Sequence, residues 1–202
     1  PDDFTFSCVL RTCAKLGAAE KNQELHAEIT RKGLERDLIV GSALIAAYCK
    51  SGSSAEAQDV FTFLAVPDVV AWTALISGYG LQLGETENAL NIFDKMLKES
   101  VKPDNITFII ILNVCSRARL FDSSLMYLEA MARDHGIIPS VEHHVCMMDL
   151  FARVGRIDMA LDLVKRMPIK SDLDVWQTIL RSCRECGNME LGKEVFKNAV
   201  SI

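Results

Sequence analysis

The fold is decided by Val69-Val-Ala-Trp-Thr-Ala-Leu-Ile-Ser-Gly-Tyr79, followed by Ala89-Leu-Asn-Ile-Phe-Asp-Lys-Met96 and then by Val101-Lys-Pro-Asp104. Apolar residues in the first two segments recur at i, i+3 and i+4, which indicates helices and not strands. The Pro-Asp pair that closes the stretch favours a helix start, because proline fits the first turn and aspartate caps it. The stretch therefore predicts two helices, a turn between them, and the start of a third helix.

The same pattern recurs along the whole chain of 202 residues. A Pro-Asp pair or a related dipeptide occurs six times, and an apolar block follows about seven residues later. Cutting after each dipeptide divides the chain into repeats one to six, which are 3–37, 38–68, 69–104, 105–140, 141–172 and an incomplete 173–202. Positions are counted below from the first residue of each repeat.

Several positions keep one residue type across the repeats. Position 4 is aromatic in four of six, positions 7 and 8 are apolar in all six, and position 15 is glycine in four, with Gly84 one place late in repeat three. Glycine in the middle of a repeat indicates a left-handed residue between two helices. We expect helix A at positions 2–13 and helix B at positions 17–28. Because one hairpin cannot bury its own apolar face, the repeats must stack, and the sequence predicts an all-α fold, a right-handed α-solenoid of stacked helix-turn-helix repeats.

Composition argues against several classes of protein. No run reaches the ~18 apolar residues of a membrane span, and seven cysteines are too few for a disulfide framework. A net charge of −5 and a pI near 5.4 are unusual for a nucleic-acid binder. However, positions 1–13 of the six repeats sum to +2, so the remaining residues carry −7. The acidic residues therefore lie mainly outside the helix A segments.

Known catalytic motifs are missing from the sequence. It contains no Gly-rich phosphate loop and no nucleophile elbow. Cys183-x-x-Cys186 could begin a zinc site, but Cys13, Cys115 and Cys183 share position 11, which favours buried packing residues. We expect no metal, no cofactor, no small-molecule substrate and no enzymatic activity.

The repeats resemble pentatricopeptide repeats over essentially the whole chain. The order of repeat lengths is similar to that of the plant PLS subclass. Val141-Glu-His-His-Val-Cys-Met-Met-Asp-Leu150 resembles its closing S-type repeat, and Leu173 to Ile202 resembles the start of an E-type extension. On this basis 3–37 is an L-type repeat, 38–68 S-type, 69–104 P-type, 105–140 the closing L-type, 141–172 the closing S-type and 173–202 a partial E-type extension.

The resemblance implies a sequence-specific, single-stranded RNA-binding protein of plant mitochondria or chloroplasts that selects sites for cytidine-to-uridine RNA editing. A deaminase signature is absent from the chain. The resemblance also implies possible partners, namely multiple organellar RNA editing factors and a deaminase-bearing protein. As an alternative function, the chain would be a protein-interaction scaffold that recruits these partners. Candidate apolar contacts for that role are Phe4, Phe6, Ile109, Ile110, Phe121 and Met126.

In this family, position 5 and the last residue of a repeat together read one base. A hydroxyl at position 5 selects a purine and a terminal aspartate then selects guanine. An ionised carboxylate only accepts hydrogen bonds, so it suits bases that present a ring N–H. The pairs that follow the rule are Ser7 with Asp37, Ser42 with Asp68, and Thr73 with Asp104. Repeats two and three should therefore favour adjacent guanines. The alternative is that the aspartates only cap the next helix.

Position 2 is expected to hold an apolar wedge, and neighbouring wedges would sandwich a base. Its occupants in repeats one to four are Phe4, Ile39, Val70 and Ile106; Glu142 and Asp174 follow, so the pattern stops. Ordinary core packing is the alternative. Position 13 is cationic in four repeats, and phosphate contact is the functional interpretation of Lys15, Lys50, Arg117 and Arg153. Stabilisation of a helix C-terminus is the alternative for these cations.

Overall fold

The computed structural model describes residues 2–82, 84–166, 176–177, 180–181, 183–184 and 187–200. Its described elements are all α-helices: α1 (Asp3–Leu16), α2 (Ala19–Arg31), α3 (Leu38–Lys50), α4 (Ser54–Phe63), α5 (Val69–Leu81), α6 (Thr86–Lys98), α7 (Asn105–Arg117), α8 (Phe121–Arg133), α9 (Val141–Val154), α10 (Ile157–Arg166) and α12 (Met189–Val200). These bounds agree with the predicted helix A and helix B segments to within two residues, and helix A of repeat six, predicted at 174–185, lies mostly outside the described residues. None of the described helices is both long and apolar enough to span a bilayer.

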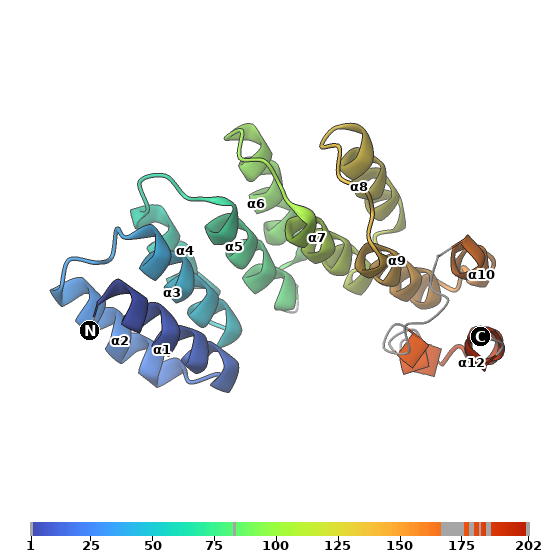
Figure 1. The fold of residues 1–202 in the computed structure, drawn as a ribbon, viewed down its shortest axis with the longest axis horizontal. Helices are drawn as coiled ribbons and strands as arrows, with labels where there is room; N and C mark the ends of the chain where they lie inside the picture. The colour runs from blue at the N-terminus through green and yellow to red at the C-terminus, as the bar shows by residue number, and fades with distance from the viewer. Residues whose placement is uncertain are drawn as a thin grey trace. The chain divides into compact units, whose positions relative to one another are not determined.

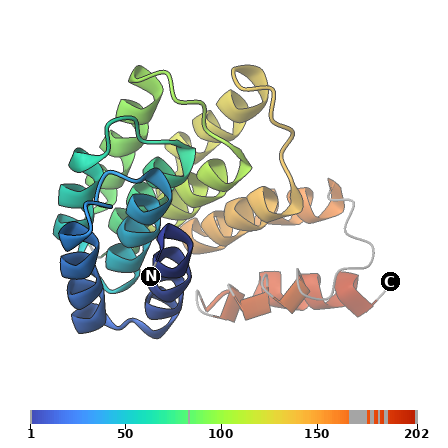
Figure 2. The same cartoon turned by 60° about the vertical axis from the view of Figure 1, so that its left-hand side comes forward.

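The chain forms two compact parts, Pro1–Ile110 and Ile111–Ile202. In the first part, α3 packs against both α1 and α5, so the first helices of the hairpins form a row. The second helices α2 and α4 each pack against the first helix of their own hairpin and of the next one. Figures 1 and 2 show these hairpins following one another along the chain. In the second part, α9 packs against α8 and α10, and α10 packs against α12. The predicted fold class, an all-α solenoid of stacked hairpins, is confirmed.

The apolar residues that recur at the same positions of the repeats form the core. The aromatic residues at position 4, Phe6, Trp72, Phe108 and Trp176, are all buried. Trp72 meets the ring of Phe61 edge-on, with 4.6 Å between the ring centroids. Phe108 meets Phe93 in the same way at 5.9 Å. These pairs join helix B of one repeat to helix A of the next, and edge-to-face contacts of this kind add to the area that each ring buries.

Two apolar residues of α1 depart from the predicted core. Cys8 is exposed, and Val9, at the apolar position 7, is 39% exposed. The reason is that α1 packs only against α2 and α3 among the described helices, so its remaining face is open to solvent. The other cysteines that the structure describes, Cys13, Cys49, Cys115, Cys146 and Cys183, are buried as expected, and Cys186 lies outside the described residues.

The turns between paired helices have the predicted left-handed residue. Gly17, Gly52, Gly84, Gly155 and Gly187 all have φ between 64° and 86°. Repeat four has Arg119 at this position, and its φ is 58°. A side chain there costs roughly 1–2 kcal/mol, because Cβ approaches the following carbonyl oxygen. The fold therefore imposes the turn even where the sequence lacks glycine.

A close approach between two helices also depends on glycine. A Cβ atom added to Gly78 of α5 would lie 2.1 Å from Sγ and 2.6 Å from Cβ of Cys49 on α3. Such contacts are impossible without movement of one helix. Burial raises the pKa of the Cys49 thiol to about 12, so this side chain is a neutral packing group at neutral pH.

Arg119→Gly is expected to stabilise the protein by about 0.5–1 kcal/mol, because it removes the left-handed strain. Chemical denaturation monitored by circular dichroism measures the effect. Arg119→Ala is the matched control: it removes the same side chain but keeps Cβ. Equal stabilisation by both variants would show that backbone strain at this position is unimportant.

Gly78→Ala is expected to destabilise the protein by about 1–3 kcal/mol, because it overpacks the contact between α3 and α5. Gly192→Ala in α12 is the control, since among the described residues its new Cβ would meet only Cβ of Cys183, at an ordinary 3.7 Å. That control should be neutral or slightly stabilising, because alanine favours helix more than glycine does. Thermal unfolding compares the two. A stable Gly78→Ala protein would contradict the proposed tight packing.

Candidate RNA-binding site

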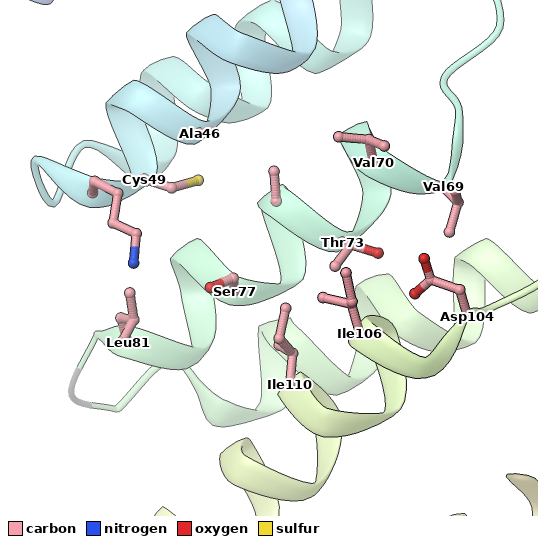
Figure 3. Close-up of a pocket in the computed structure, with 12 residues that line it drawn as sticks. Ala46, Cys49, Val69, Val70, Thr73, Ser77, Leu81, Asp104, Ile106 and Ile110 are labelled. Carbon is pink, nitrogen blue, oxygen red and sulfur yellow. The ribbon is translucent and has the colours of Figure 1, made fainter. Parts of the chain in front are cut away.

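A pocket opens between the first helices of three consecutive repeats, all within Pro1–Ile110. Its volume is about 250 Å³, at the small end of ligand pockets. It unites five residues predicted from the sequence for three separate roles: Val70 and Ile106 as wedges, Thr73 and Asp104 as the base-reading pair, and Lys50 as a phosphate contact. In Figure 3, Val70 of α5 and Ile106 of α7 flank the opening, and the side chains of Thr73 and Asp104 point toward one another.

The rest of the pocket wall is formed by Ala46, Cys49, Val69, Ala74, Ser77, Leu81 and Ile110. These side chains are apolar except for Ser77, so Thr73 and Asp104 form a polar edge of a largely apolar wall. An apolar slot with a few polar atoms at one end suits a flat ring with hydrogen-bonding groups on one edge. The lining therefore matches the chemistry of a nucleobase.

The four wedge residues are not core residues. The exposed fractions are 72% for Phe4, 57% for Ile39, 57% for Val70 and 60% for Ile106. Their neighbours at position 4 are almost fully buried, so the two positions face opposite sides of helix A. This exposure excludes the core-packing alternative for position 2. Glu142, which follows at position 2 of repeat five, is also exposed, and Asp174 lies outside the described residues.

The aspartates at the ends of the repeats do cap the next helix. Oδ1 of Asp37, Asp68 and Asp104 accepts hydrogen bonds from the backbone N–H groups of Val40, Ala71 and Thr107, at 2.9, 2.9 and 2.8 Å. The capping interpretation is therefore confirmed. Capping engages only Oδ1 of each carboxylate. Within the described part of the chain, no hydrogen bond engages Oδ2 in any of the three residues.

The three position-5 hydroxyl groups have different surroundings. Ser7 donates to the carbonyl oxygen of Phe4 at 2.9 Å, within its own helix. Ser42 is buried, and its Oγ lacks a hydrogen-bond partner among the described residues. Oγ1 of Thr73 lies 2.8 Å from Oγ1 of Thr107. Thr107 was missed by the sequence analysis, because position 3 of a repeat had no assigned role.

The predicted phosphate contacts also differ. Lys15, Lys50 and Arg117 are exposed. Arg153 is partly buried, and its Nε lies 2.7 Å from Oδ2 of Asp149, which also accepts from Ser116 at 2.6 Å. The guanidinium of Arg153 is thus already paired with a carboxylate within its own helix. No feature of the repeat pattern indicated Asp149.

Repeat four ends without a carboxylate. Ser140 takes the place of the terminal aspartate, and its hydroxyl lies 2.8 Å from Nδ1 of His143. The backbone N–H of Ser140 donates to the same ring nitrogen at 3.1 Å. His143 is fully buried. This capping box starts α9, and its geometry differs from the aspartate caps of the earlier repeats. Asp172, the terminal residue of repeat five, lies outside the described residues.

Comparison with solved structures supports the fold. The crystal structure of the maize pentatricopeptide repeat protein PPR10 matches all of this chain and 30% of that chain, with a TM-score of 0.76 and 19% sequence identity. The same protein in complex with an 18-nt psaJ RNA element matches with a TM-score of 0.69 and 15% identity, over 35% of that chain. The PPR domain of the Arabidopsis thaliana protein-only RNase P 1, in complex with tRNA, matches over 98% of this chain and 88% of that one, with a TM-score of 0.53 and 14% identity.

Comparison with known sequences gives closer relatives. One pentatricopeptide repeat-containing protein of Arabidopsis thaliana is 38% identical over all of this chain, which spans 23% of that protein. A mitochondrial one is 34% identical over 99% of the chain and a chloroplastic one 36% over 94%, and the chain spans 32% and 22% of their lengths. The chain thus spans about a fifth to a third of the length of these relatives.

Family models match three stretches of the chain. The model of the PPR repeat family matches residues 67–117. The model of the PPR repeat matches residues 42–63 and 143–171. These matches together cover half of the sequence and fall within repeats two to five, and the match over 67–117 begins two residues before repeat three. The chain therefore belongs to the pentatricopeptide repeat family.

Proposed function

We propose that this chain is a sequence-specific, single-stranded RNA-binding segment of a plant mitochondrial or chloroplast protein. The observation that carries the proposal is the pocket in which Val70, Ile106, Thr73, Asp104 and Lys50 meet. The RNA complex of PPR10 supports it, because that protein shares this fold.

Each group in the pocket has a distinct task. A base would insert between the exposed side chains of Val70 and Ile106, which offer apolar contact to both of its faces. Its polar edge would then meet Thr73 and the free Oδ2 of Asp104. Lys50, at the C-terminal end of α3, would neutralise the neighbouring phosphate. Ser42 and Asp68 form the corresponding pair in the preceding repeat, so two adjacent guanines are the favoured target.

Selection of sites for cytidine-to-uridine editing is the finer part of the proposal. It rests on the order of repeat lengths, which resembles that of the PLS subclass, and on the partial E-type extension at 173–202. The chain would choose the transcript site, and a deaminase-bearing protein would act on the cytidine, with multiple organellar RNA editing factors as further protein partners. No catalytic step is assigned to the chain itself.

A role as a protein-interaction scaffold is the second candidate. It is favoured by exposed apolar side chains, since Phe4 is 72% and Met126 53% exposed. Phe6 does not belong to such a surface, because it is buried in the core, and Ile109, Ile110 and Phe121 are only partly accessible. The two roles share Phe4 and Ile110, which lines the base pocket, and otherwise use different residues, so both are compatible with one chain.

The base preference is tested by fluorescence anisotropy with short single-stranded RNAs that differ only at two adjacent bases: GG, AA, CC and UU. GG should bind most tightly, and affinity should fall as salt rises, because phosphate contacts release counterions. The double variant Ser42→Asn with Thr73→Asn should shift the preference from purines toward pyrimidines and leave protein partners unaffected. An unchanged base preference in the double variant would refute the assignment of these pairs.

The phosphate contact is tested with Lys50→Gln. Its affinity should fall by a similar factor for every RNA, and the slope of log affinity against log salt should decrease by about one. Lys95→Gln is the matched control, because Lys95 lies on the second helix α6, where its Nζ is 3.9 Å from Oε1 of Glu99. That control should leave affinity and slope unchanged. Equal losses in both variants would indicate only a general charge effect.

A further inference from the structure

Thr107 connects the two residues of the base-reading pair in repeat three. Its Oγ1 lies 2.8 Å from Oγ1 of Thr73 and 2.8 Å from Oδ1 of Asp104. The backbone N–H of Asp104 points back to the same hydroxyl oxygen at 3.3 Å. Thr107 is fully buried and Thr73 is 8% exposed, so water does not compete for these contacts. The three side chains form a continuous chain of hydrogen bonds.

The number of hydroxyl protons determines which group donates and which accepts in each of these hydrogen bonds. A hydroxyl group has one proton to donate and two lone pairs to accept with. The carboxylate of Asp104 only accepts, so Thr107 must use its one proton on Oδ1. Thr107 is then an acceptor toward the N–H of Asp104 and toward Thr73. The hydroxyl proton of Thr73 is therefore donated to Thr107. Toward any other group, Thr73 presents only lone pairs and acts as an acceptor.

We propose that Thr107 is a positioning residue that makes Thr73 a hydrogen-bond acceptor, so that repeat three presents two acceptors and selects guanine over adenine. This proposal rests on the proposed RNA-binding function. Guanine carries two adjacent donors on its pairing edge, the ring N1–H and the amino group at N2. Adenine offers one amino donor beside an unprotonated ring nitrogen, which would face a lone pair. Thr73 and Oδ2 of Asp104 thus match guanine and repel the acceptor of adenine.

Repeat two lacks this device. Repeat three follows repeat two, and its position 3, which corresponds to Thr107 of repeat four, holds Ala71. Alanine has no hydroxyl group. Asp68 still accepts from the backbone of Ala71, but the hydroxyl of Ser42 has no partner among the described residues. It can rotate and either donate or accept. Repeat two therefore accepts both purines more evenly than repeat three does, although the two base-reading pairs are chemically alike.

The first test measures RNA binding by the whole chain to GG, GA, AG and AA. Thr107→Val removes the hydroxyl group and keeps the shape of the side chain. Discrimination between guanine and adenine should therefore fall about tenfold at the base that repeat three reads. At the base that repeat two reads, it should stay unchanged. Thr107→Ser keeps the hydroxyl and should retain the discrimination. Ala71→Ser adds a hydroxyl beside repeat two and should raise discrimination at the other base.

Thr5→Val is the matched control for these variants. Thr5 donates to Asp2 as Thr107 does to Asp104, but it is exposed and lies in repeat one, far along the chain from the base-reading pairs of repeats two and three. It should leave discrimination at both positions unchanged. Retained discrimination in Thr107→Val, or an equal loss in Thr5→Val, would overturn the proposal.

The second test needs no RNA. Nuclear magnetic resonance should detect a slowly exchanging hydroxyl proton on Thr73, with a cross-peak to Thr107, and Thr107→Val should abolish it. A rapidly exchanging Thr73 proton in the unaltered protein would overturn the hydrogen-bond chain itself. If that proton is protected but no RNA binds, the proposed function fails together with the selectivity, and the hydrogen-bond chain stands as a structural feature alone.

Discussion

A hairpin of two helices has more apolar surface than it can cover by itself, and this constraint governs the whole structure. The buried face of α5 holds Trp72, Leu75 and Ile76, which are covered by α3, α4 and α6. Stacking places the first helices in a row, and Gly78 lets two of them approach as closely as Cys49 permits. The residues at position 2 of repeats one to four are among those that such packing does not cover. Their exposure is therefore a consequence of how the hairpins stack.

The same arrangement gives polar residues two tasks at once. Each terminal aspartate uses Oδ1 to cap a helix, which stabilises the repeat on its own by roughly 1 kcal/mol. The cap fixes the carboxylate at the start of the next helix A and leaves its second oxygen without a hydrogen bond among the described residues. A stabilising contact and a recognition group thus come from one side chain, and evidence for capping does not weaken the case for recognition.

Variation between the repeats lies in the polar details. The backbone of the turn is retained even where Arg119 replaces glycine. By contrast, Thr107, Ala71 and His143 occupy the same position 3 and give three different hydrogen-bonding arrangements. In the proposed site, these differences would alter how strictly each repeat reads its base. Repeats that look alike at positions 5 and last are not equivalent once their neighbours are included.

The sequence alone determined the repeat period, the helix bounds, the glycine turns and the candidate residues of the pocket. These features are local or periodic, so they follow from spacing along the chain. Only the tertiary structure decided that Thr73 contacts Thr107, 34 residues away, that Arg119 adopts a left-handed conformation and that Cys8 is exposed. The physical reason is that each depends on which neighbouring helix covers a given face. Periodicity predicts that helices stack, and packing alone settles which polar atoms then meet.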